Sequence, residues 1–130
     1  EELLSKKGVK YIGTGKIQHE PLGDGKYKKH FRYLGKKNTF GQIYLTRNCF
    51  FEPSMLPTKN WVDSCLAQIQ SAFLFSKPAV ICSHRVNFVG FINEKNRDRG
   101  LKDLNQLLKQ VLKKWPDVKF ISTDQLSKYI

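Results

Sequence analysis

Acidic residues, cysteines and long apolar runs are scarce in this chain of 130 residues, and each scarcity excludes a class of protein. The 11 Asp and Glu residues stand against 23 Lys and Arg residues, which gives a net charge of +12. No apolar run approaches the roughly 20 residues that a membrane-spanning helix needs. No apolar segment follows a basic start, as it would in a secretory signal peptide. The hydrophobic fraction of 40% is nevertheless typical of a folded globular domain and not of a disordered chain.

The chain has only three cysteines, Cys49, Cys65 and Cys82, and no two of them form a C-x-x-C pair. An odd number of cysteines argues against a complete disulfide framework. Cys65 lies on an apolar helical stripe and Cys82 lies in an apolar strand, so we expect both to be small buried side chains. This cysteine usage indicates a reducing compartment, and we expect a cytoplasmic location.

The length of the chain suits one domain and is too short for two ordinary ones. The chain opens with Glu1-Glu2-Leu3-Leu4 and has no initial Met. These first residues resemble the last turn of a helix whose beginning lies upstream. We therefore expect residues 1–130 to be a single partial domain, with more chain upstream.

Apolar periodicity predicts strands that alternate with helices in most of the chain. The expected strands are 9–12, 41–46, 78–83 and 118–122, and the expected helices are 61–75, 101–115 and a short one capped by Thr123. Alternation of this kind implies crossover connections and a mainly parallel α/β sheet. Two architectures fit the pattern: a small open sheet, or the closing half of an α/β barrel.

Residues 13–39 form a long polar segment that is rich in Gly and Lys, and we expect a basic loop or hairpin there. Within it, residues 26–33 interleave cations with aromatic rings, a pattern that suits stacking on nucleic-acid bases or on sugar rings. A twisted ribbon with solvated lysines is the alternative. His19 and His30 also lie in this segment, but their spacing is not that of metal ligands, so we expect no metal site or cofactor in this chain.

Polar side chains follow two of the predicted strands. Arg47 and then Glu52 come after the strand at 41–46, and His84 comes directly after the strand at 78–83. Because the carboxyl ends of parallel strands meet at one edge of a sheet, we expect these side chains to line one cleft.

In that cleft His84 would act as a general acid near neutral pH, and Arg47 would orient a carboxylate. We assign substrate binding to Glu52, Arg85 and Asn87. The alternatives are that His84 only satisfies the end of a strand, and that Arg47 pairs with Glu52 or with Asp63.

Three stretches carry a resemblance to a known family: residues 47–54, residues 77–88 with Ser83-His84-Arg85, and residues 115–123 with Trp115-Pro116. Together they resemble the later part of polysaccharide deacetylase-like proteins, the NodB-like relatives of carbohydrate esterases. Within that family they resemble the bacterial branch that is linked to surface polysaccharide synthesis. The likeness is best over residues 40–130.

The resemblance implies a distorted (β/α) barrel, commonly with seven strands, of which this chain would be the C-terminal portion. It implies a hydrolase that removes acetyl groups from sugars with a divalent, zinc-like metal. His84 matches the general acid of the family's last motif. Arg47 matches the Arg that braces the catalytic Asp, although the residues after it depart from the usual Pro-aromatic-Gly.

The early family motifs, Thr-Phe-Asp-Asp and His-x-x-x-His, do not occur in this sequence. Since those motifs supply the base and the metal ligands, we expect this chain alone to be inactive as a deacetylase. The expected partner is a carbohydrate substrate, and open strand edges would permit self-association. Neither nucleic acid nor a membrane is an expected partner. The alternative function is a non-catalytic basic module that binds polyanions, either acidic polysaccharide or nucleic acid.

Overall fold

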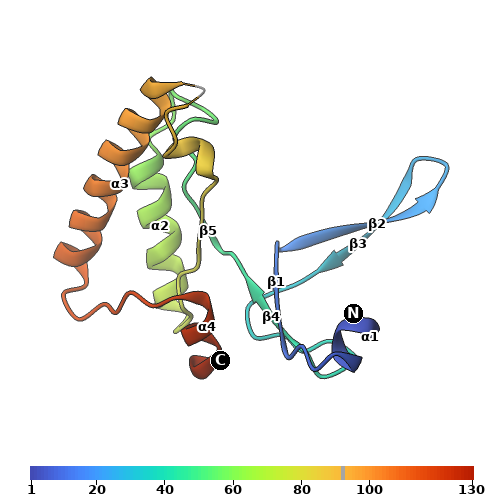
Figure 1. Cartoon of the computed structure of the whole chain (residues 1–130). Coiled ribbons are helices and arrows are strands. Elements are labelled where there is room, and N and C mark those ends of the chain that lie inside the picture. Colours follow the sequence, from blue (N-terminus) through green and yellow to red (C-terminus); the bar gives the residue numbers. More distant parts are fainter. Residues whose placement is uncertain (92) are drawn as a thin grey trace. The chain divides into compact units, whose positions relative to one another are not determined.

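The computed structural model describes residues 1–91 and 93–130, which form a mixed α/β fold of helices and short strands (Figure 1). The elements in chain order are α1 (Glu2–Lys6), β1 (Tyr11–Thr14), β2 (Ile17–Gly23), β3 (Lys26–Phe31), β4 (Ile43–Thr46), β5 (Cys49–Phe50), α2 (Trp61–Leu74), β6 (Ile81–Cys82), η1 (Arg85–Asn87), α3 (Glu94–Lys114), α4 (Thr123–Leu126) and η2 (Ser127–Tyr129). Two compact units are present. Unit 1 contains Glu1–Asn48 and Ile121–Ile130, and unit 2 contains Cys49–Phe120.

Unit 1 contains two separate pairs of strands. β1 and β4 pair in parallel, and the apolar and hydroxyl side chains of Tyr44, Leu45 and Thr46 on β4 are buried. β2 and β3 form an antiparallel hairpin. Its two-residue turn, Asp24-Gly25, has positive φ at both positions (51° and 72°), as the turns that match the twist of a hairpin require.

Unit 2 is built around α2 and α3, which pack against each other; β5 packs against α2, and η1 packs against α3. Asn60 begins α2, because its side-chain oxygen accepts a hydrogen bond from the backbone N–H of Asp63. The apolar residues that recur at helical spacing point into a shared core. The buried members of this core are Cys49, Phe51, Trp61, Val62, Cys65, Ile69, Leu107 and Val111.

Comparison with the predicted elements confirms the two long helices and corrects one predicted strand. The predicted strand at 118–122 is wrong: these residues are irregular, with Phe120 and Ile121 exposed. The antiparallel β2–β3 hairpin lies within residues 13–39, where a basic loop or hairpin was expected, and the other two strand pairs are parallel, as expected. The sheets of the described residues are three separate pairs, and they close no barrel.

Two further expectations concern burial and domain organisation. All three cysteines are free and buried, which confirms the prediction for Cys65 and Cys82. None of the described helices has both the length and the apolar composition needed to cross a bilayer. The assignment of residues 1–130 to one partial domain stays a prediction.

Candidate functional site

The register of the β5–β6 pair brings Glu52 and His84 together in unit 2. In this parallel pair Phe50 lies opposite Cys82. Beyond the pair, the backbone N–H of Phe51 donates to the carbonyl of Cys82 at 2.9 Å, which keeps the two chains adjacent. Glu52 and His84 each follow two residues after the opposed positions, so both side chains emerge at the carboxyl end of the same short sheet.

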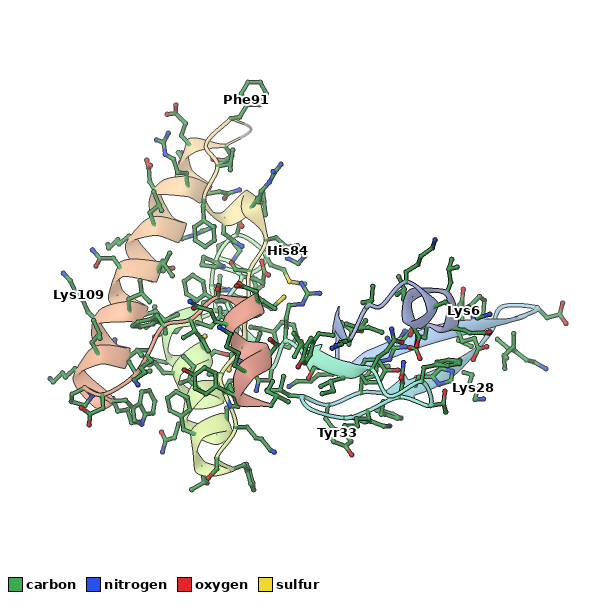
Figure 2. All side chains as sticks on the ribbon, turned by 60° about the horizontal axis from the view of Figure 1, so that its bottom comes forward. Lys6, Lys28, Tyr33, His84, Phe91 and Lys109 are labelled. Carbon is green, nitrogen blue, oxygen red and sulfur yellow. The ribbon has the colours of Figure 1, made fainter. Side chains whose placement is uncertain are left out.

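The side chains of Glu52 and His84 form a hydrogen-bonded pair. The Nδ1 atom of His84 lies 2.7 Å from Oε1 of Glu52, and the backbone N–H of His84 donates to Oε2 at 3.3 Å. The Glu52 side chain is 7% exposed, whereas the imidazole is 71% exposed. Figure 2 labels His84 among the side chains of the ribbon. A buried carboxylate therefore anchors an imidazole whose opposite edge is in solvent.

This geometry assigns the hydrogen on the neutral imidazole. An ionised carboxylate can only accept hydrogen bonds, so Nδ1 carries the hydrogen and Nε2 keeps its lone pair. The solvent-facing Nε2 can then take up a proton and release it again. Between uptake and release of the proton the ring is an imidazolium, and the carboxylate of Glu52 stabilises that cation, as the carboxylate does in other carboxylate–imidazole pairs.

Asn87 holds the carboxylate of Glu52 from the inside of unit 2. Its side chain is fully buried, and its Nδ2 donates to Oε2 of Glu52 at 2.7 Å and to the carbonyl of His84 at 2.9 Å. Its Oδ1 accepts from the backbone N–H of Ser54 at 2.9 Å and from the Ser54 hydroxyl. Nδ2 also lies 3.1 Å from Oγ of Ser83. Because burial of a carboxylate is costly without partners, these bonds are what permit Glu52 to lie inside.

Gly100 on α3 allows the turn that contains Asn87 to approach the helix. A Cβ atom at this position would lie 1.8 Å from the carbonyl oxygen of Asn87 and 2.8 Å from its carbonyl carbon. Only a residue without a side chain fits there. The helix therefore fixes η1, and through η1 it fixes the asparagine that holds Glu52.

The structure brings together three of the five predicted site residues. His84, Glu52 and Asn87 are in direct contact, but Glu52 and Asn87 are buried and hydrogen-bonded within the protein. In the structure these two side chains hold the His84 ring and its loop, and their predicted contact with substrate stays a prediction. Arg85 lies in η1 beside them and is exposed, so its predicted role in substrate binding stays a prediction.

Arg47 is exposed and lies outside this network. It follows β4, which pairs with β1 in unit 1, whereas His84 follows β6, which pairs with β5 in unit 2. The sequence pattern predicts that Arg47 and His84 follow strands of one sheet. In the structure they follow strands of two separate pairs. Of the two carboxylates that were considered as partners of Arg47, Glu52 contacts His84 and Asp63 accepts from the Asn60 side chain. The catalytic role of Arg47 stays a prediction.

Three residues of the site were not identified from the sequence: Ser54, Ser83 and Gly100. The serines lie within the stretches that carry the family resemblance, but a hydroxyl gives no signal of its own in a sequence. Gly100 is a glycine within a strongly periodic helix, where it weakens the helix and suggests a packing reason. The glycine at this position was therefore the only sequence signal of the close contact between the helix and Asn87.

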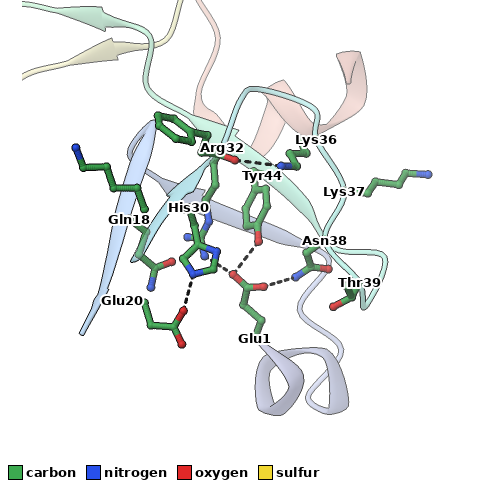
Figure 3. A pocket seen from close by; sticks show the side chains of 12 residues that line it. Glu1, Gln18, Glu20, His30, Arg32, Lys36, Lys37, Asn38, Thr39 and Tyr44 are labelled. Carbon is green, nitrogen blue, oxygen red and sulfur yellow. Dashed lines mark hydrogen bonds and ion pairs between the residues drawn. The ribbon is translucent and has the colours of Figure 1, made fainter. Parts of the chain in front are cut away.

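A second polar cluster lies in unit 1 and lines a cavity of about 780 Å³ (Figure 3). The Glu1 carboxylate accepts hydrogen bonds from the Tyr44 hydroxyl at 2.7 Å, from Asn38 at 3.1 Å and from Arg32. Burial raises the pKa of Glu1, but these three partners outweigh burial and lower the pKa overall. The hydrogen-bonding groups of these four side chains are paired with one another, which indicates a structural role for the cluster.

The described residues do not fit the divalent metal that the family resemblance implies. Metal centres of this kind need several His, Cys, Asp or Glu ligands around one point. No group of three such side chains that could hold a metal ion occurs in residues 1–91 and 93–130. Comparison with family models, with curated proteins and with solved structures found no match to this chain.

Proposed function

We propose that this chain provides the proton-donating part of a polysaccharide deacetylase-like hydrolase that acts on acetylated sugars of surface polysaccharide. Its fold would be the C-terminal portion of a distorted (β/α)7-type barrel. The proposal combines the resemblance of residues 77–88 with one structural observation. His84 is exposed and is anchored through Nδ1 to the buried Glu52, which leaves Nε2 directed away from the protein partner.

In this proposal His84 works as a general acid on the departing sugar. The imidazolium form donates its Nε2 proton to the departing nitrogen or oxygen of the sugar as the bond of that atom to the acetyl carbon breaks, which leaves an amine or a hydroxyl group on the sugar. His84 is left neutral with its hydrogen on Nδ1, where Glu52 still accepts it. Glu52 and Asn87 are positioning residues, because they orient the imidazole and touch no reacting atom.

The proposal assigns only half of a deacetylase site to this chain. The base and metal-ligand motifs of the family are missing from the sequence, and the described residues contain no alternative metal cluster. We therefore expect the chain by itself to release no acetate from acetylated oligosaccharides in the presence of zinc or cobalt ions. Robust release of acetate would contradict this part of the proposal.

Ligand recognition at His84 can be tested without turnover. The chain, labelled with ¹⁵N in its histidines, is titrated with a panel of N-acetylated and O-acetylated oligosaccharides and with their deacetylated counterparts. We expect the His84 ring signals to shift with at least one acetylated member, and to shift less with its deacetylated counterpart. His30 in unit 1 provides an internal reference, because its ring also contacts a carboxylate: Nε2 of His30 lies 2.6 Å from Oε2 of Glu20.

Two results would decide against the proposal. One is a panel in which no acetylated sugar changes the His84 signals. The other is a set of shifts of equal size at His84 and His30, which would indicate non-specific binding. A His84→Ala variant assigns the signals, and since the ring is mostly exposed the variant should retain the fold.

A further inference from the structure

The β2–β3 hairpin of unit 1 has two faces of different chemistry. In its antiparallel register Ile17 lies opposite Phe31, His19 opposite Lys29, and Pro21 opposite Tyr27. Because opposed residues point to the same side of a sheet, these six side chains share one face. We call them the ladder face. The other face carries Gln18, Glu20, Lys28 and His30.

The large apolar side chains of the ladder face are exposed. Ile17, Tyr27 and Phe31 are 47%, 61% and 64% exposed, respectively. The ring of His19 lies edge-on to that of Tyr27, with centroids 6.2 Å apart. A two-stranded hairpin is only marginally stable in water, and exposed contiguous apolar side chains often mark a binding surface. This face therefore has the character of a docking surface.

The charges of the hairpin differ between the two faces. On the polar face the Glu20 carboxylate lies 2.6 Å from the His30 ring and opposite Lys28 in the register, so the negative charge of Glu20 offsets the positive charge of Lys28. On the ladder face Lys29 is exposed, and it forms none of the salt bridges of the described residues. Its ammonium group is available to an anion.

Along β3 the ladder face presents an aromatic ring, a cation and a second aromatic ring: Tyr27, Lys29 and Phe31. At about 3.4 Å per residue, the two rings are attached roughly 14 Å apart, with the lysine midway. A ligand that fits this row is an extended chain with apolar ring faces and an occasional negative charge. The net charge of +12 favours the approach of such an anionic chain.

We propose that the ladder face binds an acidic polysaccharide, with sugar rings on Tyr27 and Phe31 and a sugar carboxylate on Lys29. The choice of a polysaccharide rests on the proposed function. The sparse charge of the row supports the same choice. A single-stranded nucleic acid carries one phosphate with every base and is bound in grooves that are positively charged throughout. The ladder face offers one fixed cation for two rings.

The test measures binding of polygalacturonate, a carboxylated polysaccharide, by calorimetry at two salt concentrations. Neutral dextran and a 20-mer of deoxythymidine are the comparison probes. We expect polygalacturonate to bind more tightly than both and to lose affinity as salt rises. The Tyr27→Ala and Lys29→Gln variants should each weaken binding about fivefold or more.

Lys28→Gln is the matched control. It removes the same charge one residue away, but from the opposite face of the same strand. We expect less than a twofold change in affinity. Equal losses in Lys28→Gln and Lys29→Gln would overturn the proposal, since they would indicate non-specific attraction by net charge. Tighter binding of the oligonucleotide, or no binding of polygalacturonate, would overturn it as well.

This test is independent of the outcome at His84. The His84→Ala variant is expected to bind polygalacturonate as the unmodified chain does, because His84 lies in unit 2 and the ladder face lies in unit 1. A failure of the ladder-face proposal shows as absent binding of polygalacturonate. A failure of the proposed function shows as His84 ring signals that no acetylated sugar changes. Far-UV circular dichroism of each hairpin variant shows whether the fold is retained.

Discussion

His84 and Glu52 are bonded at 2.7 Å because each stands two residues beyond an opposed pair of the β5–β6 ladder. Their contact spans 32 residues of sequence and is produced by only two paired positions in each strand. The result is a buried carboxylate that fixes the tautomer of an exposed imidazole. The predictions below test this pair, the residues that support it, and the core beneath it.

Replacement of Glu52 by Gln should change the tautomer of His84. The amide group of Gln can donate a hydrogen bond to Nδ1, whereas the carboxylate can only accept one. We expect ¹⁵N spectra of the neutral ring to move from the Nδ1–H form toward the Nε2–H form. The control is Glu20→Gln, which alters the His30 pair and should leave the His84 spectrum unchanged. A His84 spectrum that is the same in the Glu52→Gln variant and in the unmodified chain would refute the assigned hydrogen bond.

Replacement of Asn87 by Ala should destabilise unit 2. It removes partners from Glu52 and from the backbone N–H of Ser54, and it leaves the buried carboxylate with fewer hydrogen bonds. An unsatisfied buried polar group costs about 1–3 kcal/mol, and a charged group costs more. We expect urea unfolding to show a loss of roughly 3 kcal/mol in the free energy of unfolding.

Asn105→Ala is the control for that variant, because Asn105 is exposed on α3. Alanine favours a helix more than asparagine does, so this change should be neutral or slightly stabilising. Similar losses in the two variants would contradict the supporting role of Asn87.

Replacement of Gly100 by Ala should also destabilise unit 2, although alanine is the better helix former by about 1 kcal/mol. The added Cβ would meet the carbonyl oxygen of Asn87 at 1.8 Å, so η1 has to move away from α3. We expect a lower unfolding midpoint and changed ring signals of His84. Gly13→Ala is the matched control, since a Cβ there meets nothing within 4 Å. A Gly100→Ala variant as stable as the unmodified chain would show that the close approach does not matter.

The thiol of Cys65 should stay protonated well into the alkaline range. Burial raises its pKa from 9.0 to about 12, and the neighbouring Cys49 contributes to the shift. We expect the folded chain to protect Cys65 from a thiol reagent such as dithionitrobenzoate at mildly alkaline pH, and urea to expose it. Mass spectrometry of the labelled peptide identifies the residue. Rapid labelling of Cys65 in the folded chain would contradict its position in the core.

The same shift makes stability depend on pH in a defined direction. Between pH 9.0 and about pH 12 the unfolded thiol loses its proton while the folded thiol keeps it. The folded state then binds more protons than the unfolded state, so the free energy of unfolding falls as pH rises through this window. A Cys65→Ala variant should show a smaller loss across this window in urea titrations. An equal loss in both proteins would assign the alkaline sensitivity to other groups.

The long helices were predictable because their signals are local. Val62, Cys65 and Ile69 recur at helical spacing, and all three are buried in α2. Asn60 caps that helix, and an asparagine directly before the first residue of an apolar helical pattern is a typical start signal. The strand predicted at 118–122 failed because the apolar pattern of Phe120 and Ile121 says nothing about a pairing partner, and these residues find none among the described strands.

The sequence by itself determined the chemical groups of this protein: an imidazole at the end of a short apolar strand, a carboxylate after another, and an excess of positive charge. Only the tertiary structure decided that the Glu52 carboxylate contacts the His84 ring, and that Asn87 lies inside and supports the carboxylate. The physical reason is that a side-chain periodicity reports which face of an element is apolar, whereas register depends on which strands pair. Two backbone pairings between Cys49–Phe50 and Ile81–Cys82 selected the partner of the histidine.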